Sequence, residues 1–295
     1  MAGNSGRLGL HLRDFRLIPA RSFCLKTRSR MKKLSFQIIG SSSSGNCAVL
    51  RSPNCTLLID AGFSGKKIKE NLATLGLSLR DIDAVFFTHE HSDHSEGARG
   101  LSREEHLNFF ANRLTAEAIE RKLTRRLSWQ FFETGTSFEF CDLRVTSFAI
   151  PHDTNDPVGF VFSCGETAGT TEKLAWVTDC GKITNPVRRA VADVNTLVLE
   201  ANYDEKMLDA SERPLELKAR IRGTHGHLSN DAAAEFLKDY ENDRLERVLF
   251  AHVSRECNSC GNVENLGVPA LGTRASYASF VDPFAFLPEN AGWGF

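Results

Sequence analysis

The densest group of side chains suited to metal chemistry in this 295-residue sequence is the run Thr88-His-Glu-His-Ser-Asp-His94. His89 and His91 are two residues apart, so in an extended segment both imidazoles point to the same side and can bind one metal ion. Asp93 and His94 follow in the turn beyond and can bind a second ion. Imidazole nitrogen and carboxylate oxygen favour zinc, manganese or iron over calcium. The run is not a zincin motif, because that requires His-Glu-x-x-His.

Further ligands are needed, because four residues do not complete two metal sites. Three candidates each follow an apolar, strand-like segment directly: His152, Asp179 and His252. Each of them alone is an ordinary polar residue at the end of a strand. Three in the same context as the histidine run favour one shared site over a histidine-rich surface loop that binds metal adventitiously.

A sheet edge is required to bring these distant residues together. Apolar patterns predict strands at 34–40, 47–50, 56–60, 83–88, 129–132, 137–141, 143–148, 158–164, 173–178, 196–200 and 247–252, the last clear strand. Helices are expected at 64–75 with Ser64 as the cap, at 115–123 with Thr115 as the cap, at 186–193, and at 229–240 with Ser229 as the cap. Many strands with interspersed helices indicate two packed sheets with helices on their outer faces. Residues 33–265 are expected to form this domain.

Two further segments narrow the interpretation. Together with the strand-end residues, Gly40-Ser-Ser-Ser-Ser-Gly-Asn46 and Gly226-His-Leu-Ser-Asn230 resemble the metallo-β-lactamase superfamily, and within it the YycJ/WalJ-like branch. The resemblance runs from residue 33 to residue 262. It implies an α+β fold, the four-layer αββα metallo-β-lactamase sandwich, with two divalent metal ions, zinc or manganese. It also implies a phosphodiester hydrolase, in this branch a 5′→3′ exonuclease acting on nucleic acid, DNA rather than RNA.

The resemblance also implies a role for each candidate residue. The first ion would be bound by His89, His91 and His152. The second ion would be bound by Asp93, His94 and His252, and Asp179 would bridge the two ions. Paired ions of this kind clamp the attacking and leaving oxygens and lower the pKa of a water between them. Asp93 is counted among the catalytic residues as well as among the ligands.

Glu200 and His227 are the candidates for protonation of the leaving oxygen. Glu200 ends an apolar strand, and His227 lies in the Gly-His-Leu-Ser segment. By resemblance to phosphodiesterases such as tRNase Z, Glu200 would orient His227, and His227 would act as the general acid. Two alternatives stay open: His227 is a loop histidine bonded to backbone, or His225 takes the acid role.

Two other functions remain open at this level. One is a thioester or amide hydrolase of the same fold, which uses a better leaving group or a different proton donor. The other is a non-catalytic metal-binding regulatory module, because residues 266–295 depart from the family pattern in a tail rich in Gly and Pro. That tail receives no assignment, and the oligomeric state is left open.

The distribution of charge along the sequence limits where a polyanion such as a nucleic acid could bind. The net charge is −1, but residues 1–33 hold nine Lys and Arg and one acid, so the remainder carries −9. A nucleic acid would therefore depend on local basic patches and on the metal ions. Candidates for backbone contacts are Lys218, Arg220 and Arg222, which a solvated face explains equally well. A second basic group ends the helix at 115–123 and comprises Arg121, Lys122, Arg125 and Arg126.

Residues 1–32 differ from the rest in being basic, rich in Ser and nearly free of acids. They are interpreted as a transit peptide or as the product of an upstream start, with translation beginning at Met31. The protein is accordingly expected in the cytoplasm, or in an organelle if the segment is a transit peptide. No run reaches the roughly 18 apolar residues of a membrane span, so no membrane partner is expected. Eight scattered cysteines indicate a reducing compartment, and Cys257-Asn-Ser-Cys260 lacks the second pair that a structural zinc needs.

Overall fold

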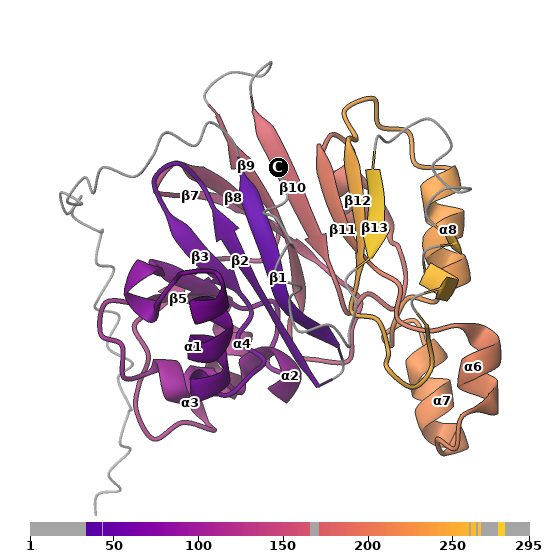
Figure 1. Cartoon of the computed structure of the whole chain (residues 1–295), viewed down its shortest axis with the longest axis horizontal. Helices are drawn as coiled ribbons and strands as arrows, with labels where there is room; N and C mark the ends of the chain where they lie inside the picture. Colours follow the sequence, from indigo (N-terminus) through magenta and orange to yellow (C-terminus); the bar gives the residue numbers. More distant parts are fainter. Residues whose placement is uncertain are drawn as a thin grey trace, which may run out of the picture.

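Two β-sheets pack face to face in the computed structural model of the protein, and helices cover the outer face of each sheet (Figure 1). The structure describes residues 34–42, 44–165, 171–259, 261–263, 265–266 and 277–280. The expectations for residues 1–32 and for Cys260 lie outside these residues. Within the described residues, no helix combines the length and the apolar character needed to cross a bilayer.

The first sheet has six strands in sequential order. They are β1 (Ser35–Ser42), β2 (Gly45–Arg51), β3 (Thr56–Ile59), β4 (Ala84–Phe86), β5 (Asn108–Ala111) and β6 (Trp129–Phe131). The first three strands pair antiparallel, and β3 to β6 pair parallel. The associated helices are α1 (Gly65–Thr74), the 3-10 turn η1 (Leu79–Asp81), α2 (Ser92–Ser95), α3 (Ala98–Leu101) and α4 (Arg113–Glu120).

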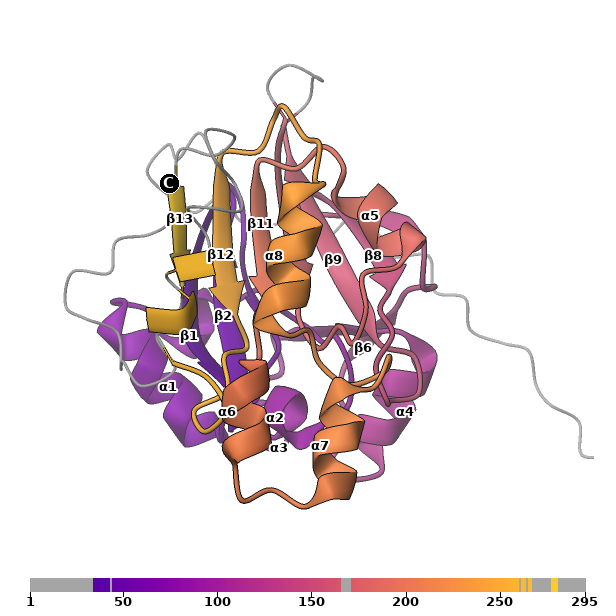
Figure 2. The same cartoon turned by 90° about the vertical axis from the view of Figure 1, so that its right-hand side faces the viewer.

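The second sheet has the order β13-β12-β11-β10-β9-β8-β7. In chain order its strands are β7 (Ser137–Phe140), β8 (Leu143–Ala149), β9 (Val158–Cys164), β10 (Glu172–Val177), β11 (Thr196–Glu200), β12 (Arg247–Ala251) and β13 (Tyr277–Phe280). Helices α5 (Asn185–Val191) and α8 (Asn230–Lys238) cover its outer face, while α6 (Glu205–Ala210) and α7 (Leu215–Arg222) lie beyond one end of it (Figure 2).

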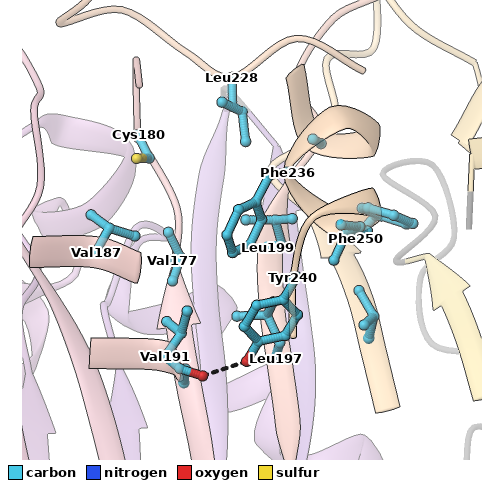
Figure 3. Close-up of a cluster of buried hydrophobic side chains, with 14 of the residues drawn as sticks. Val177, Cys180, Val187, Val191, Leu197, Leu199, Leu228, Phe236, Tyr240 and Phe250 are labelled. Atoms are coloured by element: carbon cyan, nitrogen blue, oxygen red, sulfur yellow. Dashed lines mark hydrogen bonds between the residues drawn. The ribbon is translucent and has the colours of Figure 1, made fainter. Parts of the chain in front are cut away.

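Successive side chains along each strand point to opposite faces of the sheet, and this alternation produces the layers of the fold. In β3, Leu57 and Ile59 face the space between the sheets, whereas Leu58 faces the helices. In β11, Leu197 and Leu199 face the helices of the second sheet instead. This outer layer contains Val187 and Val191 of α5 together with Phe236 of α8 (Figure 3), and the Tyr240 hydroxyl donates to the Val191 carbonyl. The expected four-layer αββα sandwich is confirmed.

Most helix boundaries follow the expected caps. Ser64 and Ser229 accept hydrogen bonds from the first turns of α1 and α8, as expected. The expected cap at Thr115 is wrong: Asn112 caps α4 by accepting from the Thr115 amide, so the helix begins before Thr115. Asn is as strong a cap as Thr, and here the buried Thr115 lies inside the helix.

The expectation that 247–252 is the last clear strand is also wrong. β13, Tyr277–Phe280, pairs parallel with β12 and extends the second sheet into the tail that received no assignment. A parallel edge strand far from its partner in the chain has no local turn signal, so its pairing depends on tertiary context.

Candidate metal centre

The candidate ligands meet at one edge of the sandwich, where several strands end. β8, β10, β11 and β12 run in the same direction in the second sheet, so their carboxyl ends share an edge. The end of β4 joins them, because the Val158 amide donates to the Thr88 carbonyl at 3.0 Å. The residues that follow β4, β8, β10 and β12 are therefore brought together, although they lie up to 163 positions apart in the chain.

One cluster consists of His89, His91 and His152, whose ligand atoms lie within 4.8 Å of one another. His91 Nδ1 is 3.2 Å from His152 Nε2. His152 Nδ1 is 3.0 Å from the Gly226 carbonyl oxygen, so this nitrogen donates and Nε2 keeps its lone pair. His89 Nδ1 lies 3.0 Å from the Thr88 hydroxyl, while its Nε2 is buried without a hydrogen-bond partner. An imidazole ring that is hydrogen-bonded through one nitrogen and leaves the other nitrogen without a partner is typical of a metal ligand.

A second cluster consists of Asp93, His94 and His252. His94 Nδ1 lies 2.7 Å from Asp60 Oδ2, and His252 Nδ1 lies 2.7 Å from Glu200 Oε1. Each carboxylate fixes the tautomer of its ring and directs Nε2 into the cluster. The Nε2 atom of His252 is buried and has no hydrogen-bond partner. An unpartnered ring nitrogen in each cluster is a costly arrangement unless a cation occupies the position.

Asp179 lies between the two clusters. Its Oδ2 is 3.1 Å from His94 Nε2, and its Oδ1 is 3.5 Å from His252 Nε2 and 3.6 Å from His152 Nε2. One carboxylate thus reaches ligands of both clusters, which is the position of a bridge. The donor set of buried imidazoles and carboxylates fits a dinuclear metal site.

The electrostatics of the centre also favour a cation. Burial raises the pKa of Asp179, but the charges of His252 and His94 outweigh burial and hold it well below its usual range. Burial opposes the charged form of His94, yet Asp179 and Asp60 raise its pKa well above the ordinary value. Burial likewise opposes protonation of His252, and Asp179 raises its pKa to about 10. The ionised carboxylates therefore keep His94 and His252 protonated, and a metal ion bound to these rings would displace their protons.

Three residues of the centre leave their strands in the left-handed conformation. The φ angles of Asp60, Asp179 and His252 are 58°, 56° and 56°. This conformation costs a non-glycine residue on the order of 1–3 kcal/mol, so surrounding contacts must hold it. At His252 the amide donates to Ser41 Oγ at 2.6 Å, and the carbonyl accepts from Asn202 Nδ2 at 2.7 Å.

Glu200 connects the metal cluster with His227. Its Oε1 lies 2.9 Å from His227 Nδ1 and 2.7 Å from His252 Nδ1, while Oε2 accepts from the amides of Cys180 and Leu228. Burial raises the pKa of Glu200, but His227 and His252 outweigh it and lower the pKa to about 2. The carboxylate therefore stays ionised, and His227 is held by Nδ1. His225 has no such partner; it is exposed, and its Nδ1 lies 3.2 Å from the Thr224 hydroxyl.

A cleft of about 260 Å³ opens over the centre. His91, Asp93, Asp179, His227 and His252 line it, and residues around α7 form one wall. Of the basic candidates in that helix, only Arg220 lines the cleft, where it pairs with Asp153. Lys218 is buried instead and donates to the carbonyls of Asp209 and Ser211, and Arg222 pairs with Glu205 and Asp209. Arg213, which the sequence did not single out, also lines the cleft.

Two glycines permit the close approach of the loops that carry the site. A Cβ on Gly226 would lie 2.2 Å from the carbonyl oxygens of Arg220 and Ile221. A Cβ on Gly62 would lie 1.7 Å from the Asp93 carbonyl oxygen. Both distances are far shorter than real contacts, so side chains at these positions would displace the loops bearing His227 and Asp93.

Apart from Glu200, the residues that hold the ligands were not identified as such from the sequence. Asp60 orients His94, Asn202 contacts both Nδ1 and the carbonyl of His252, and Asn46 Nδ2 lies 3.0 Å from His94 Nε2. Asp60 had a usable signal, because it ends the apolar strand 56–59 in the same way that Asp179 ends β10. Asn46 ends the Gly40–Asn46 motif, although no role was assigned to it, and Asn202 carries no signal that distinguishes it from an ordinary loop residue.

Comparison with known proteins places these features in a family. The family described as the beta-lactamase superfamily domain matches residues 56–253. The chain is 32% identical over 227 residues to exodeoxyribonuclease YycJ of Bacillus anthracis, covering 76% of this chain and 84% of the relative. It is 34% identical over 227 residues to exodeoxyribonuclease WalJ of Streptococcus pneumoniae, covering 76% and 82%. Among solved structures, the metallo-beta-lactamase fold protein YhfI from Bacillus subtilis matches with a TM-score of 0.64 at 13% identity, covering 85% of this chain and 98% of that one.

Proposed function

The chain belongs to the metallo-β-lactamase superfamily, and from this membership we propose that it is a metal-dependent phosphodiesterase, an exonuclease that removes nucleotides from the 5′ end of DNA. The observation that carries the proposal is His227, which lines the cleft beside the candidate metal ligands while Glu200 holds its Nδ1. A phosphodiester has a poor alkoxide leaving group, so a positioned proton donor at this place has a clear use.

Seven residues would hold the metal ions: His89, His91 and His152 at the first position, Asp93, His94 and His252 at the second, and Asp179 between them. Two divalent ions, zinc or manganese, would supply an activated water and neutralise charge on the phosphate. Asp60 and Glu200 keep the rings of His94 and His252 in the ligating tautomer. Asp93 lines the cleft, where its carboxylate can also orient the attacking water.

The proton on the leaving oxygen comes from His227. Because Nδ1 is occupied by Glu200, Nε2 is the nitrogen that remains for the substrate. The Glu200 carboxylate is ionised and buried, and its contact with Nδ1 fixes the orientation of the ring. Solvent can reprotonate His227 after the transfer, because its side chain is 23% exposed.

DNA is the proposed substrate for two reasons. The relatives at 32% and 34% identity are named exodeoxyribonucleases. In addition, Arg213 and Arg220 on the cleft wall offer guanidinium groups to phosphate oxygens, and Leu217 and Ile221 line the same cleft and can contact the apolar parts of a nucleotide.

Hydrolysis of small esters tests the reaction class. The full-length protein with zinc or manganese is assayed with bis(p-nitrophenyl) phosphate, an acyl-glutathione thioester and a β-lactam. Turnover of the phosphodiester alone supports the proposal. Turnover of the thioester or lactam without the phosphodiester overturns it in favour of a thioester or amide hydrolase. Two bound metal ions with no turnover of any ester overturn it in favour of a non-catalytic module.

A further inference from the structure

A second, smaller hollow adjoins the metal cleft. Its volume is about 110 Å³, and it is lined by Ser92, Ser95, Glu96, Arg99, Ile119, Lys122 and Leu123. Ser92 lines both this hollow and the cleft, so the two are neighbours across a single residue of the metal-ligand loop.

The far side of this hollow is basic. The segment 121–126, here called the basic turn, follows α4 and contains Arg121, Lys122, Arg125 and Arg126, all of them exposed. Arg99 adds a fifth exposed cation on the facing helix α3. Segments 92–99 and 117–126 together contain these five cations and four acids, Asp93, Glu96, Glu117 and Glu120. This surplus contrasts with the charge of −9 carried by residues 34–295 as a whole.

The basic turn is attached to the metal-ligand loop. Lys122 Nζ donates to the Glu90 carbonyl at 3.0 Å, and Glu90 lies between the candidate ligands His89 and His91. Glu90 is itself fixed, because its Oε1 accepts from the amide and the side chain of Asn155. Lys122 therefore ties the basic turn to the loop that carries the candidate ligands.

The helix itself does not account for all of these charges. Cations near the end of α4 interact favourably with its dipole, which explains Arg121 and Lys122. Arg125 and Arg126 lie beyond the last turn, where that effect has faded. Across the described part of the chain, no carboxylate comes within ion-pairing distance of Arg99, Arg125 or Arg126, whereas Arg121 is 4.0 Å from Glu117. Unpaired exposed arginines beside a phosphodiesterase cleft are suited to phosphate groups.

We propose that the hollow and the basic turn bind the sugar-phosphate backbone of the substrate strand next to the scissile phosphate. The inference rests on the proposed function and adds the path of the strand to it. The strand passes from the metal centre over Ser92, its next phosphate lies near Arg99 and Lys122, and the following backbone crosses Arg125 and Arg126. These contacts carry no base specificity, since they involve only phosphate groups.

The test compares two double variants of the metal-loaded, full-length protein. R125Q/R126Q removes two charges from the basic turn, and the control R80Q/R189Q removes two exposed charges from η1 and α5, away from the cleft. Both are assayed with a single-stranded DNA oligonucleotide and with bis(p-nitrophenyl) phosphate, which has no neighbouring phosphate.

We expect R125Q/R126Q to raise KM for the oligonucleotide on the order of tenfold and to lower the slope of log KM against log salt by about 1.4, or 0.7 for each lost contact. Its turnover of bis(p-nitrophenyl) phosphate should match the wild type. Equal oligonucleotide KM in the two double variants overturns the inference, as does an equal loss on both substrates. A wild type that hydrolyses bis(p-nitrophenyl) phosphate but neither binds nor cleaves DNA overturns the proposed nuclease function, and the inference with it.

Discussion

His227 Nδ1 lies 2.9 Å from Glu200 Oε1, and the same carboxylate oxygen also contacts the ring of His252. A single buried group therefore positions both the proposed acid and a candidate metal ligand. Both rings line the cleft, and His252 also belongs to the cluster with Asp93 and His94, so replacing His227 alone tests the acid role while that cluster stays intact.

Removal of the imidazole in His227→Ala should lower phosphodiester turnover by about 10²–10⁴-fold, the usual contribution of a general acid. Metal content should stay at the wild-type value, because the seven proposed ligands are untouched. Turnover of bis(p-nitrophenyl) phosphate and metal analysis of the purified variant measure the two effects. His225→Ala is the matched control and should leave both unchanged. Wild-type turnover in His227→Ala would exclude the acid role.

Asp60→Asn should weaken metal binding by about 10–100-fold, because the neutral amide no longer holds the His94 ring as a carboxylate does. Competition with a chelator measures the affinity. Asp83→Asn is the control: its Oδ2 accepts from the Thr56 amide at the opposite end of β3, far from the metal cluster. Equal affinity in the two variants would contradict the role of Asp60.

Gly226→Ala should displace the backbone of the loop that carries His227 and so disturb the site. The added methyl would lie 2.2 Å from the carbonyl oxygens of Arg220 and Ile221, and the Gly226 carbonyl holds His152. We expect a stability loss of about 1–3 kcal/mol in denaturant unfolding, with a large loss of turnover. Gly261→Ala, whose Cβ would meet no atom of the described residues within 4 Å, should change neither. A fully active, stable Gly226→Ala protein would refute the close approach.

The metal-free protein should become less stable as the pH rises. Although burial opposes protonation, the neighbouring carboxylates raise the pKa of His252 to about 10. Its stabilising contribution is complete below the unfolded value of about 6.5 and is lost as the pH rises through the folded value. The melting temperature of chelator-treated protein should therefore fall as the pH rises from about 6.5 to about 10, and His252→Gln should reduce this fall. A melting temperature that rises with pH in the chelated wild type would contradict the assignment.

Much of the site could be predicted from the sequence, because its residues share one context. His152, Asp179 and His252 each end an apolar strand, and parallel strands bring such ends to one edge. The structure brings all of them together with the His89–His94 run and places Glu200 against His227. Their roles in metal binding and catalysis stay predictions.

Other features depend on tertiary contacts that no local pattern encodes. Lys218, Arg220 and Arg222 alternate in the sequence, but they lie on a helix, where residues two apart point to different sides. Only Arg220 therefore reaches the cleft. Asn202 acts on His252 across 50 positions, and β13 pairs with β12 without a connecting turn signal.

The central claim is tested most directly with DNA labelled at either end. The full-length protein is incubated with 5′- and 3′-labelled single- and double-stranded DNA and with RNA, in zinc and in manganese. Asp179→Ala, which lacks the proposed bridge between the metal positions, is assayed alongside. The account predicts that the wild type shortens DNA from the 5′ end and that Asp179→Ala does not. A wild type that holds two metal ions and degrades no nucleic acid would contradict it.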